Sequence, residues 1–184
     1  ALDVSKESLH EIEKKKIKNV KTICADIDSI INNSIDREGL DCIHCAYGLY
    51  YAKSYKKVIK RIHDLLGNNG IFVVIGPTDN NNDELYLFLR KIYKLNNYVI
   101  FTSRDFMNQV VVPEAKKLFK KVKIKYLKNT ITYPDFDSLY NYLKNSTLYK
   151  KKYDRQLREK IEKYFENNKA FKVTKKIMAV VGQK

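Results

Sequence analysis

The sequence predicts an α/β fold with a mostly parallel sheet, and residues 40–77 carry the main evidence. This stretch contains a short apolar segment, an aromatic loop, an amphipathic helix pattern, a Gly-Asn-Asn-Gly turn and a second apolar segment. The second segment, 71–75, is an unbroken apolar run, which is typical of a strand buried on both faces of a parallel sheet. The order therefore predicts one βαβ unit, whose crossover we expect to be right-handed.

The helix of this unit is predicted by the spacing of its apolar residues. Ser54 stands where an N-cap is expected. A single apolar stripe follows, formed by Val58, Ile59, Ile62, Leu65 and Leu66. This spacing is typical of a helix that packs on a sheet. Residues 67–70 are expected to end the helix, because Gly and Asn tolerate the left-handed backbone that a helix terminus needs.

Two shorter strand candidates precede this unit. Residues 1–3 predict the end of a strand, after which Ser5 is placed to cap a helix. Residues 20–25 predict the next strand. A polar connection follows over 26–39, with a short helical piece expected at 29–33.

The second half of the chain adds further helices and two strands. Helices are predicted at 84–95, at 113–120, from Asp135 or Asp137 onward and at 149–167, and strands at 122–127 and 173–181. Residues 98–112 show no clear period, and we expect a mobile lid or a covering loop there. Neither a repeat nor a domain boundary is visible, so we expect a single domain over residues 1–184.

Composition excludes some classes of protein. The length of 184 residues suits one domain, and no run of 18 apolar residues predicts a membrane span. No secretory signal pattern is visible at the start of the sequence. The three cysteines, Cys24, Cys42 and Cys45, all fall in predicted strands. They predict buried, reduced thiols in a cytoplasmic protein.

The net charge of +15 has two interpretations. A strongly basic chain can indicate nucleic-acid binding. However, only six of the 36 basic residues are arginine, the side chain that usually makes bidentate contacts with nucleic acids. The abundance of Lys, Asn, Ile and Tyr is also what an AT-rich coding bias would produce. We therefore expect a solvated lysine surface, with nucleic-acid binding as the alternative.

Three landmarks resemble the class I S-adenosyl-L-methionine (SAM)-dependent methyltransferases, over roughly residues 1–77. Ala1-Leu2-Asp3-Val4-Ser5 resembles the second strand of that family, which ends in an acidic residue. Cys24-Ala25-Asp26-Ile27 resembles the third strand, and the unit at 40–77 resembles the fourth and fifth strands. The resemblance implies a Rossmann-like sheet, mostly parallel, in which the last strand inserts antiparallel between the fifth and the sixth.

The resemblance is incomplete at one point. The first strand of the family and its acidic-x-Gly-x-Gly loop have no counterpart among the six glycines of this sequence. Since that strand lies between the second and the fourth, its loss would leave two unpaired sheet edges. We therefore expect a partial domain that lacks its N-terminal strand. An N-terminal partner segment or a homo-oligomer would cover the open edges.

The resemblance also implies a SAM site at three strand ends, made of Asp3, Val4, Asp26, Ile27, Cys45, Ala46 and Tyr47. Asp3 would accept hydrogen bonds from the ribose hydroxyls, as acidic residues do in dinucleotide sites. Asp26 would accept from the adenine amino group while Ile27 packs on the ring. The alternatives are an N-cap or surface acid for Asp3 and a turn aspartate for Asp26.

Three further residues are candidates for the substrate side of the site: Tyr50, Tyr51 and Asp79. Aromatic faces attract a sulfonium much as they attract an ammonium ion. Each tyrosine has the alternative role of covering the core. Methyl transfer depends mainly on aligning the methyl donor with the acceptor. The sequence identifies no general base, and Asp79, Asp83 and Tyr51 are candidates for one by location only.

Metal and hydrolytic chemistry have little support. The Cys-x-x-Cys sequence at 42–45 lacks the second pair that a structural zinc site needs, and residues three apart in a strand point to opposite faces. No histidine has a partner at the spacing of a catalytic triad. His44, in a predicted strand, is expected to be packed in the core. We expect no metal.

The favoured function is therefore SAM-dependent methyl transfer to an O, N or C nucleophile of a small molecule, in the cytoplasm. The first alternative is an RNA or tRNA methyltransferase, suggested by the charge. Cys45-Ala46-Tyr47-Gly48 replaces the Asn/Asp-Pro-Pro-aromatic motif of base-amine methyltransferases, which argues against that chemistry. The second alternative is a non-catalytic partner that has kept the fold and binds another chain through a strand edge.

Overall fold

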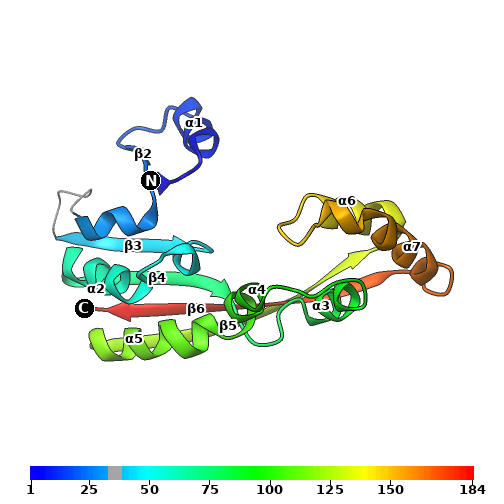
Figure 1. The fold of residues 1–184 in the computed structure, drawn as a ribbon. Helices are drawn as coiled ribbons and strands as arrows, with labels where there is room; N and C mark the ends of the chain where they lie inside the picture. The colour runs from blue at the N-terminus through cyan, green and yellow to red at the C-terminus, as the bar shows by residue number, and fades with distance from the viewer. Residues whose placement is uncertain (33–38) are drawn as a thin grey trace. The chain divides into compact units, whose positions relative to one another are not determined.

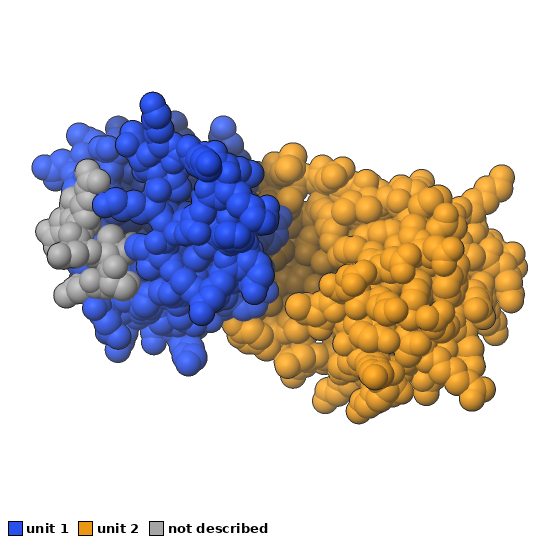
Figure 2. All heavy atoms as spheres, turned by 90° about the horizontal axis from the view of Figure 1, so that it is seen from above, with its two compact units in different colours: residues 1–76, 108–125, 179–184 blue, residues 77–107, 126–178 orange. Residues whose placement is uncertain are grey.

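The computed structural model describes residues 1–32 and 39–184, so the end of the helical piece expected at 29–33 lies outside the described residues. The chain forms two compact units, which are coloured separately in Figure 2. Unit 1 contains residues 1–76, 108–125 and 179–184, and unit 2 contains residues 77–107 and 126–178. Across the described residues, no helix is both long enough and apolar enough to cross a membrane.

Unit 1 begins with a short βαβ element, followed by the longer one that the sequence predicted (Figure 1). Its first elements are β1 (Leu2–Asp3), α1 (Lys6–Lys14), β2 (Ile23–Cys24) and the 3₁₀ helix η1 (Ile27–Asn32). The second group is β3 (Leu40–Ala46), the 3₁₀ turn η2 (Leu49–Tyr51), α2 (Tyr55–Leu65) and β4 (Leu66–Pro77). The helix α5 (Val112–Leu118) begins with Pro113 in its first turn, as predicted.

The strands form two sheets. β1 and β2 are parallel and make a two-stranded sheet, while the other sheet has the order β3-β4-β6-β5. In it, β3 and β4 are parallel, and β5 (Lys121–Tyr133) and β6 (Phe171–Gln183) complete the order. The N–H of Lys184 donates to Gly70 O and that of Thr78 donates to Lys176 O, so β6 runs antiparallel to β4. The prediction of an antiparallel last strand between its two neighbours is confirmed.

Helix α2 packs through the stripe that its sequence predicted. Val58, Ile59, Ile62 and Leu65 are each at most 2% exposed. Ser54 occupies the N-cap position, but its hydroxyl makes no capping bond. The carboxylate of Asp28 caps the helix entry instead, since it accepts the backbone N–H groups of Lys53 and Ser54 at 2.7 and 3.0 Å.

Residues 67–70 are not the turn that the sequence predicted, because α2 ends directly in β4, which includes them. A Cβ atom added at Gly70 would lie 2.8 Å from Leu40 O, so only glycine allows β3 to approach this closely. The register between β3 and β4 is irregular at this end. Further along β4, Phe72 and Val74 are buried but Ile71 is 38% exposed. The expectation that every residue of this run is buried was therefore wrong.

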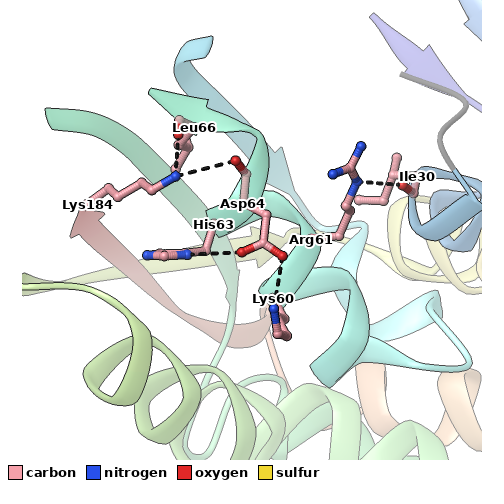
Figure 3. A network of polar contacts seen from close by, with 7 residues as sticks. All are labelled: Ile30, Lys60, Arg61, His63, Asp64, Leu66 and Lys184. Carbon is pink, nitrogen blue, oxygen red and sulfur yellow. Dashed lines mark hydrogen bonds and ion pairs between the residues drawn. The ribbon is translucent and has the colours of Figure 1, made fainter. Parts of the chain in front are cut away.

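A polar network ties the end of α2 to the last residue of the chain (Figure 3). The Lys184 ammonium donates to the carbonyls of Asp64 and Leu66, at 3.4 and 2.5 Å. The Asp64 carboxylate accepts from Lys60 at 3.0 Å and lies 3.5 Å from His63 Nδ1. Burial raises the pKa of Asp64, but the bonds to Lys60 and His63 outweigh it, and the pKa lies below its usual value.

Unit 2 is built on aromatic packing between helices and strand segments. Its helices are α3 (Asp83–Arg90), α4 (Asn97–Arg104), α6 (Phe136–Lys144), the 3₁₀ turn η4 (Lys151–Tyr153) and α7 (Asp154–Phe165). The capping box at the start of α6 selects Asp135 over Asp137 as the N-cap. Phe88, Tyr164 and Phe171 form a cluster in which every pair of ring centroids is 5.0–6.0 Å apart.

Residues 98–112 were expected to form a lid or a loop, and this expectation was wrong. They belong to α4, to the π-helix η3 (Met107–Val111) and to the start of α5. Phe106 and Met107 are 1% exposed, so the segment supplies core side chains. A π-helix has a longer turn than an α-helix, which explains why the apolar residues show no 3.6-residue period.

Candidate functional site

Unit 1 contains a cavity of about 820 Å³ at the ends of β1, β2 and β3. Such a volume is typical of small-molecule sites, which span roughly 300–1,000 Å³. Eight residues singled out from the sequence line it: Asp3, Val4, Asp26, Ile27, Cys45, Ala46, Tyr47 and Tyr51. The cavity floor includes Ile62 and Leu65 of α2. Three strand ends and one helix therefore bring the whole predicted cofactor set together.

Asp3 and Asp26 lie at the same end of the small parallel sheet. Asp3 is the register partner of Cys24, and the N–H of Ala25 donates to Asp3 O at 3.0 Å. The Oδ1 atom of Asp3 accepts the N–H of Ser5 at 2.8 Å, and that of Asp26 accepts the N–H of Asp28 at 2.8 Å. Each carboxylate is thus oriented by its own turn.

These bonds also bear on the alternative roles of the two aspartates. The N-cap of α1 is Ser5, whose hydroxyl accepts the N–H of Ser8 at 3.1 Å, so Asp3 is not the cap. Asp26 does have the turn role that was considered for it. Within residues 1–32 and 39–184, the Oδ2 atoms of Asp3 and Asp26 accept no hydrogen bond. One oxygen of each therefore remains available to a ligand.

Tyr47 has a backbone conformation that a tyrosine rarely adopts. Its φ is +54°, in the left-handed region that bulky residues avoid. The conformation is held by the bond from its N–H to Ile75 O at 2.8 Å, which continues the β3–β4 pairing. The ring is 43% exposed and lines the cavity. No sequence signal indicated this, because Gly or Asn is the usual residue in such a conformation.

Burial favours the neutral forms of Cys45 in β3 and of the tyrosines that follow the strand. Burial raises the pKa of the Cys45 thiol, although the backbone N–H groups of Gly48 and Leu49 act in the opposite direction. Burial also raises the pKa of Tyr47. Tyr50 lies against Tyr51 with ring centroids 4.7 Å apart, and burial together with this neighbour raises its pKa above the usual value. These phenols can therefore donate hydrogen bonds near neutral pH but cannot act as bases.

Two of the substrate candidates lie outside the lining of this cavity. Tyr50 is not among the lining residues, although its ring lies beside that of Tyr51, which is. Asp79 belongs to unit 2, where its N–H donates to Arg104 O at 2.8 Å and its φ is +53°. A role for Asp79 in this site stays a prediction.

The expectations for His44 and the cysteines need correction. His44, Cys24 and Cys42 are exposed, and Cys45 is partly buried. His44 and Cys42 belong to β3, an edge strand with β4 as its one neighbour in the described part of the chain, and Cys24 belongs to β2 in the two-stranded sheet. An apolar strand buries its side chains only where the face of the sheet is covered. Among the described residues, no three His, Cys, Asp or Glu side chains gather as a metal site requires.

The fold is similar to solved methyltransferase structures. A Bacillus halodurans protein, provisionally assigned as a methyltransferase, has a TM-score of 0.65 at 12% identity over 100% of this chain and 81% of its own. YcgJ from Bacillus subtilis has a TM-score of 0.64 at 13% identity, over 100% of this chain and 80% of its own. A SAM-dependent methyltransferase from Archaeoglobus fulgidus has a TM-score of 0.55 at 14% identity, over 100% of this chain and 74% of its own.

A fourth similar structure contains a bound cofactor product. The plantazolicin methyltransferase BpumL, in complex with a triazolic desmethylPZN analogue and SAH, has a TM-score of 0.51 at 14% identity, over 100% of this chain and 66% of its own. No protein-family model matches the sequence, and no match was found among curated proteins. At these identities the similarity establishes the fold: the chain has the α/β fold of SAM-dependent methyltransferases.

Proposed function

We propose that this protein binds SAM in the unit 1 cavity and transfers its methyl group to an O, N or C nucleophile of a small molecule. The observation that carries the proposal is the common location of the seven predicted cofactor residues, all of which line one cavity of about 820 Å³. The shared fold of the similar structures supports it.

The chemistry of the lining fits the nucleoside part of SAM. The ribose hydroxyls would donate to the available oxygen of Asp3, and the adenine amino group would donate to that of Asp26. Ile27 offers an apolar surface for the adenine ring, and all three residues line the cavity. Because each carboxylate is already oriented by a backbone N–H, little side-chain freedom is lost on binding.

The end of β3 fits the methionine part. Cys45, Ala46 and Tyr47 present strand-end backbone to the cavity, and the rings of Tyr47 and Tyr51 line it. Aromatic faces stabilise a nearby cation. When bound, SAM supplies an electrophilic methyl group. The protein has to align the acceptor and exclude water, and the side chains of Tyr50 and Tyr51 are the proposed substrate contacts.

We propose that a further strand pairs with the open edge of β3 in the working enzyme. In the described residues, β1–β2 and β3–β4 belong to separate sheets, and β3 lies at the edge of its own. The similar structures are longer than this chain, which spans 74–81% of the first three. The strand would come from an N-terminal segment, from a partner or from a second copy of the chain.

The small-molecule acceptor is favoured by analogy with the plantazolicin methyltransferase, which was solved with a desmethylPZN analogue. A cytoplasmic location belongs to the same proposal. The alternatives are methylation of RNA or tRNA, and a non-catalytic role as a binding partner. Titration calorimetry with SAM and with SAH tests the cofactor directly. Saturable binding of both supports the proposal, and no binding at about 1 mM SAM, where even a weak site of about −4 kcal/mol would be half filled, overturns it.

A further inference from the structure

Unit 2 has a groove of its own between α3 and α7. Its cavity of about 620 Å³ is lined by Lys91, Lys160, Lys163 and Lys172, with Phe88 and Tyr164 among its apolar residues. A second cavity of about 280 Å³ shares Lys91, Lys160 and Lys163 with it. The two cavities therefore form one continuous groove, called here the lysine groove. Each of its lining residues belongs to unit 2.

The helix periods explain why these residues face the groove together. On α7, positions 160, 163 and 164 lie on one helix face, and on α3, positions 84, 87 and 88 do the same, with Lys91 next at the C-cap of α3. The packed rings of Phe88, Tyr164 and Phe171 hold the two helices and the start of β6 together. The lysines are therefore presented by a rigid, packed base.

Basic side chains outnumber acidic ones in the groove, where four lysines stand against Glu84 and Glu159. Within residues 1–32 and 39–184, none of the four ammonium groups has a hydrogen bond or an ion pair. The two acids of the lining have other partners: Glu159 pairs with Arg155 at 2.8 Å, and Glu84 accepts from the hydroxyl and the backbone N–H of Thr174 at 2.6 and 3.0 Å, which leaves its negative charge in place. A concave surface in which positive charge predominates attracts anions.

The form of the groove favours a chain of phosphates over one phosphate. Lys91, Lys163 and Lys172 are exposed, so their ammonium groups are mobile point charges. A single phosphate is usually held by oriented donors at short distance, whereas mobile lysines suit several charges spaced along a groove. The exposed Leu87 and the partly buried Tyr164 add apolar surface for bases or sugars.

We propose that the lysine groove binds the phosphodiester backbone of single-stranded RNA, without sequence specificity. The proposal concerns binding and assigns no reaction to the RNA. It is independent of the proposed cofactor site, because the two sets of residues belong to different units. SAM calorimetry on the same samples therefore separates failure of one proposal from failure of the other.

The test is fluorescence anisotropy with a labelled 12-nucleotide oligouridylate over a range of salt concentrations. Four phosphate contacts predict a slope of log K against log salt of about −3, so affinity falls about 50-fold between 50 and 200 mM salt. The variant K91Q/K160Q/K163Q should lower the slope to about −0.7, with only about a three-fold fall in affinity over the same range.

A matched control removes the same charge elsewhere. K121Q/K123Q/K125Q changes three exposed lysines of β5 in unit 1 and should keep the steep salt dependence. Circular dichroism confirms the fold of both variants. Equal losses in the two variants would overturn the proposal, because the binding would then follow net charge alone. Absence of RNA binding at 50 mM salt would also overturn it, as would full displacement of the RNA by millimolar AMP or inorganic phosphate, which would indicate a site for one phosphate.

Discussion

Asp3 is the last residue of β1 and Asp26 lies two residues after the parallel strand β2, and each carboxylate accepts the backbone N–H of the residue two positions further along, at 2.8 Å in both cases. The two turns are thus built in the same way, at the same end of the sheet. Both side chains line the unit 1 cavity. In the proposed function, these two carboxylates are the acceptors for the nucleoside part of SAM.

Replacing either aspartate should weaken SAM binding. In D3N and D26N the hydrogen bond within the turn can persist. The side chain loses its charge, and the group that faces the ligand is then either a neutral oxygen or an NH₂ group, which cannot accept from a hydroxyl or an amino group. A hydrogen bond to a charged group contributes about 1.5–3 kcal/mol, so we expect a roughly ten- to hundredfold loss of affinity by calorimetry. D41N is the matched control, since Asp41 is exposed on β3 and does not line the cavity. Equal losses in all three variants would contradict the assignment.

The left-handed backbone of Tyr47 should be measurable as a stability difference. Y47G relieves the clash of Cβ with the backbone, whereas Y47A keeps it, so Y47G should be more stable by about 1 kcal/mol in urea unfolding. Tyr51 supplies the control, because it is not among the residues with positive φ. There Y51G should be less stable than Y51A, by about 0.5–1 kcal/mol. The same sign at both positions would disagree with the backbone described.

The network at the end of α2 predicts a pH dependence. The pKa of Asp64 in the folded protein lies below its ordinary value of 3.8 because of its bonds to Lys60 and His63. A lowered carboxyl pKa stabilises the fold above the unfolded pKa, and this stability is lost as the pH falls through the folded pKa. The side chain is 42% exposed, so the contribution is at most about 1 kcal/mol.

The measurement compares urea midpoints of the wild type and D64N between about pH 6 and pH 2. The wild type should be more stable near neutral pH, and the difference should shrink as the solution becomes acidic. K60Q removes the cation that pairs with Asp64. Near neutral pH its urea midpoint should also lie below that of the wild type, but by less than the midpoint of D64N. A difference that grows toward low pH would reverse the proposed linkage.

Gly182 should be intolerant of any side chain. A Cβ atom there would lie 2.6 Å from Cγ of Phe119, which is buried and stacked on Phe72 with centroids 5.9 Å apart. G182A should therefore destabilise the protein by about 1–3 kcal/mol in thermal or urea unfolding. The double variant G182A/F119L should recover part of this loss, because leucine vacates space beside the new methyl group. Additive effects of the two substitutions would show that the contact is not the cause.

Much of the fold was predictable because the relevant patterns are local. The stripe on α2 and the apolar run of β4 each specify one element, and the chain order then fixes their pairing. The position of β6 between β4 and β5 came from the resemblance, which supplied the topology that no local pattern contains. The candidate site was predicted from the resemblance as well, because it puts Asp3 and Asp26 at the ends of two neighbouring strands.

The missed features depend on neighbours that the sequence does not show. His44 and Cys42 were expected to be buried because they stand in a predicted apolar strand, yet both are exposed on β3, the edge strand of its sheet. The positive φ of Tyr47 results from its bond to Ile75, which only the three-dimensional pairing creates. The lysine groove was missed for a similar reason, because α3 and α7 are distant in sequence and no pattern brings Lys91 beside Lys160.

The open edge of β3 has a practical consequence for handling the protein. Seven residues there, Leu40–Ala46, have β4 as their one partner strand in the described residues, so backbone groups on the other side can pair with a neighbouring molecule. Repulsion between molecules of net charge +15 opposes this contact. Because added salt screens that repulsion within about 10 Å at 0.1 M, solutions should become turbid on raising the ionic strength and clear on dilution.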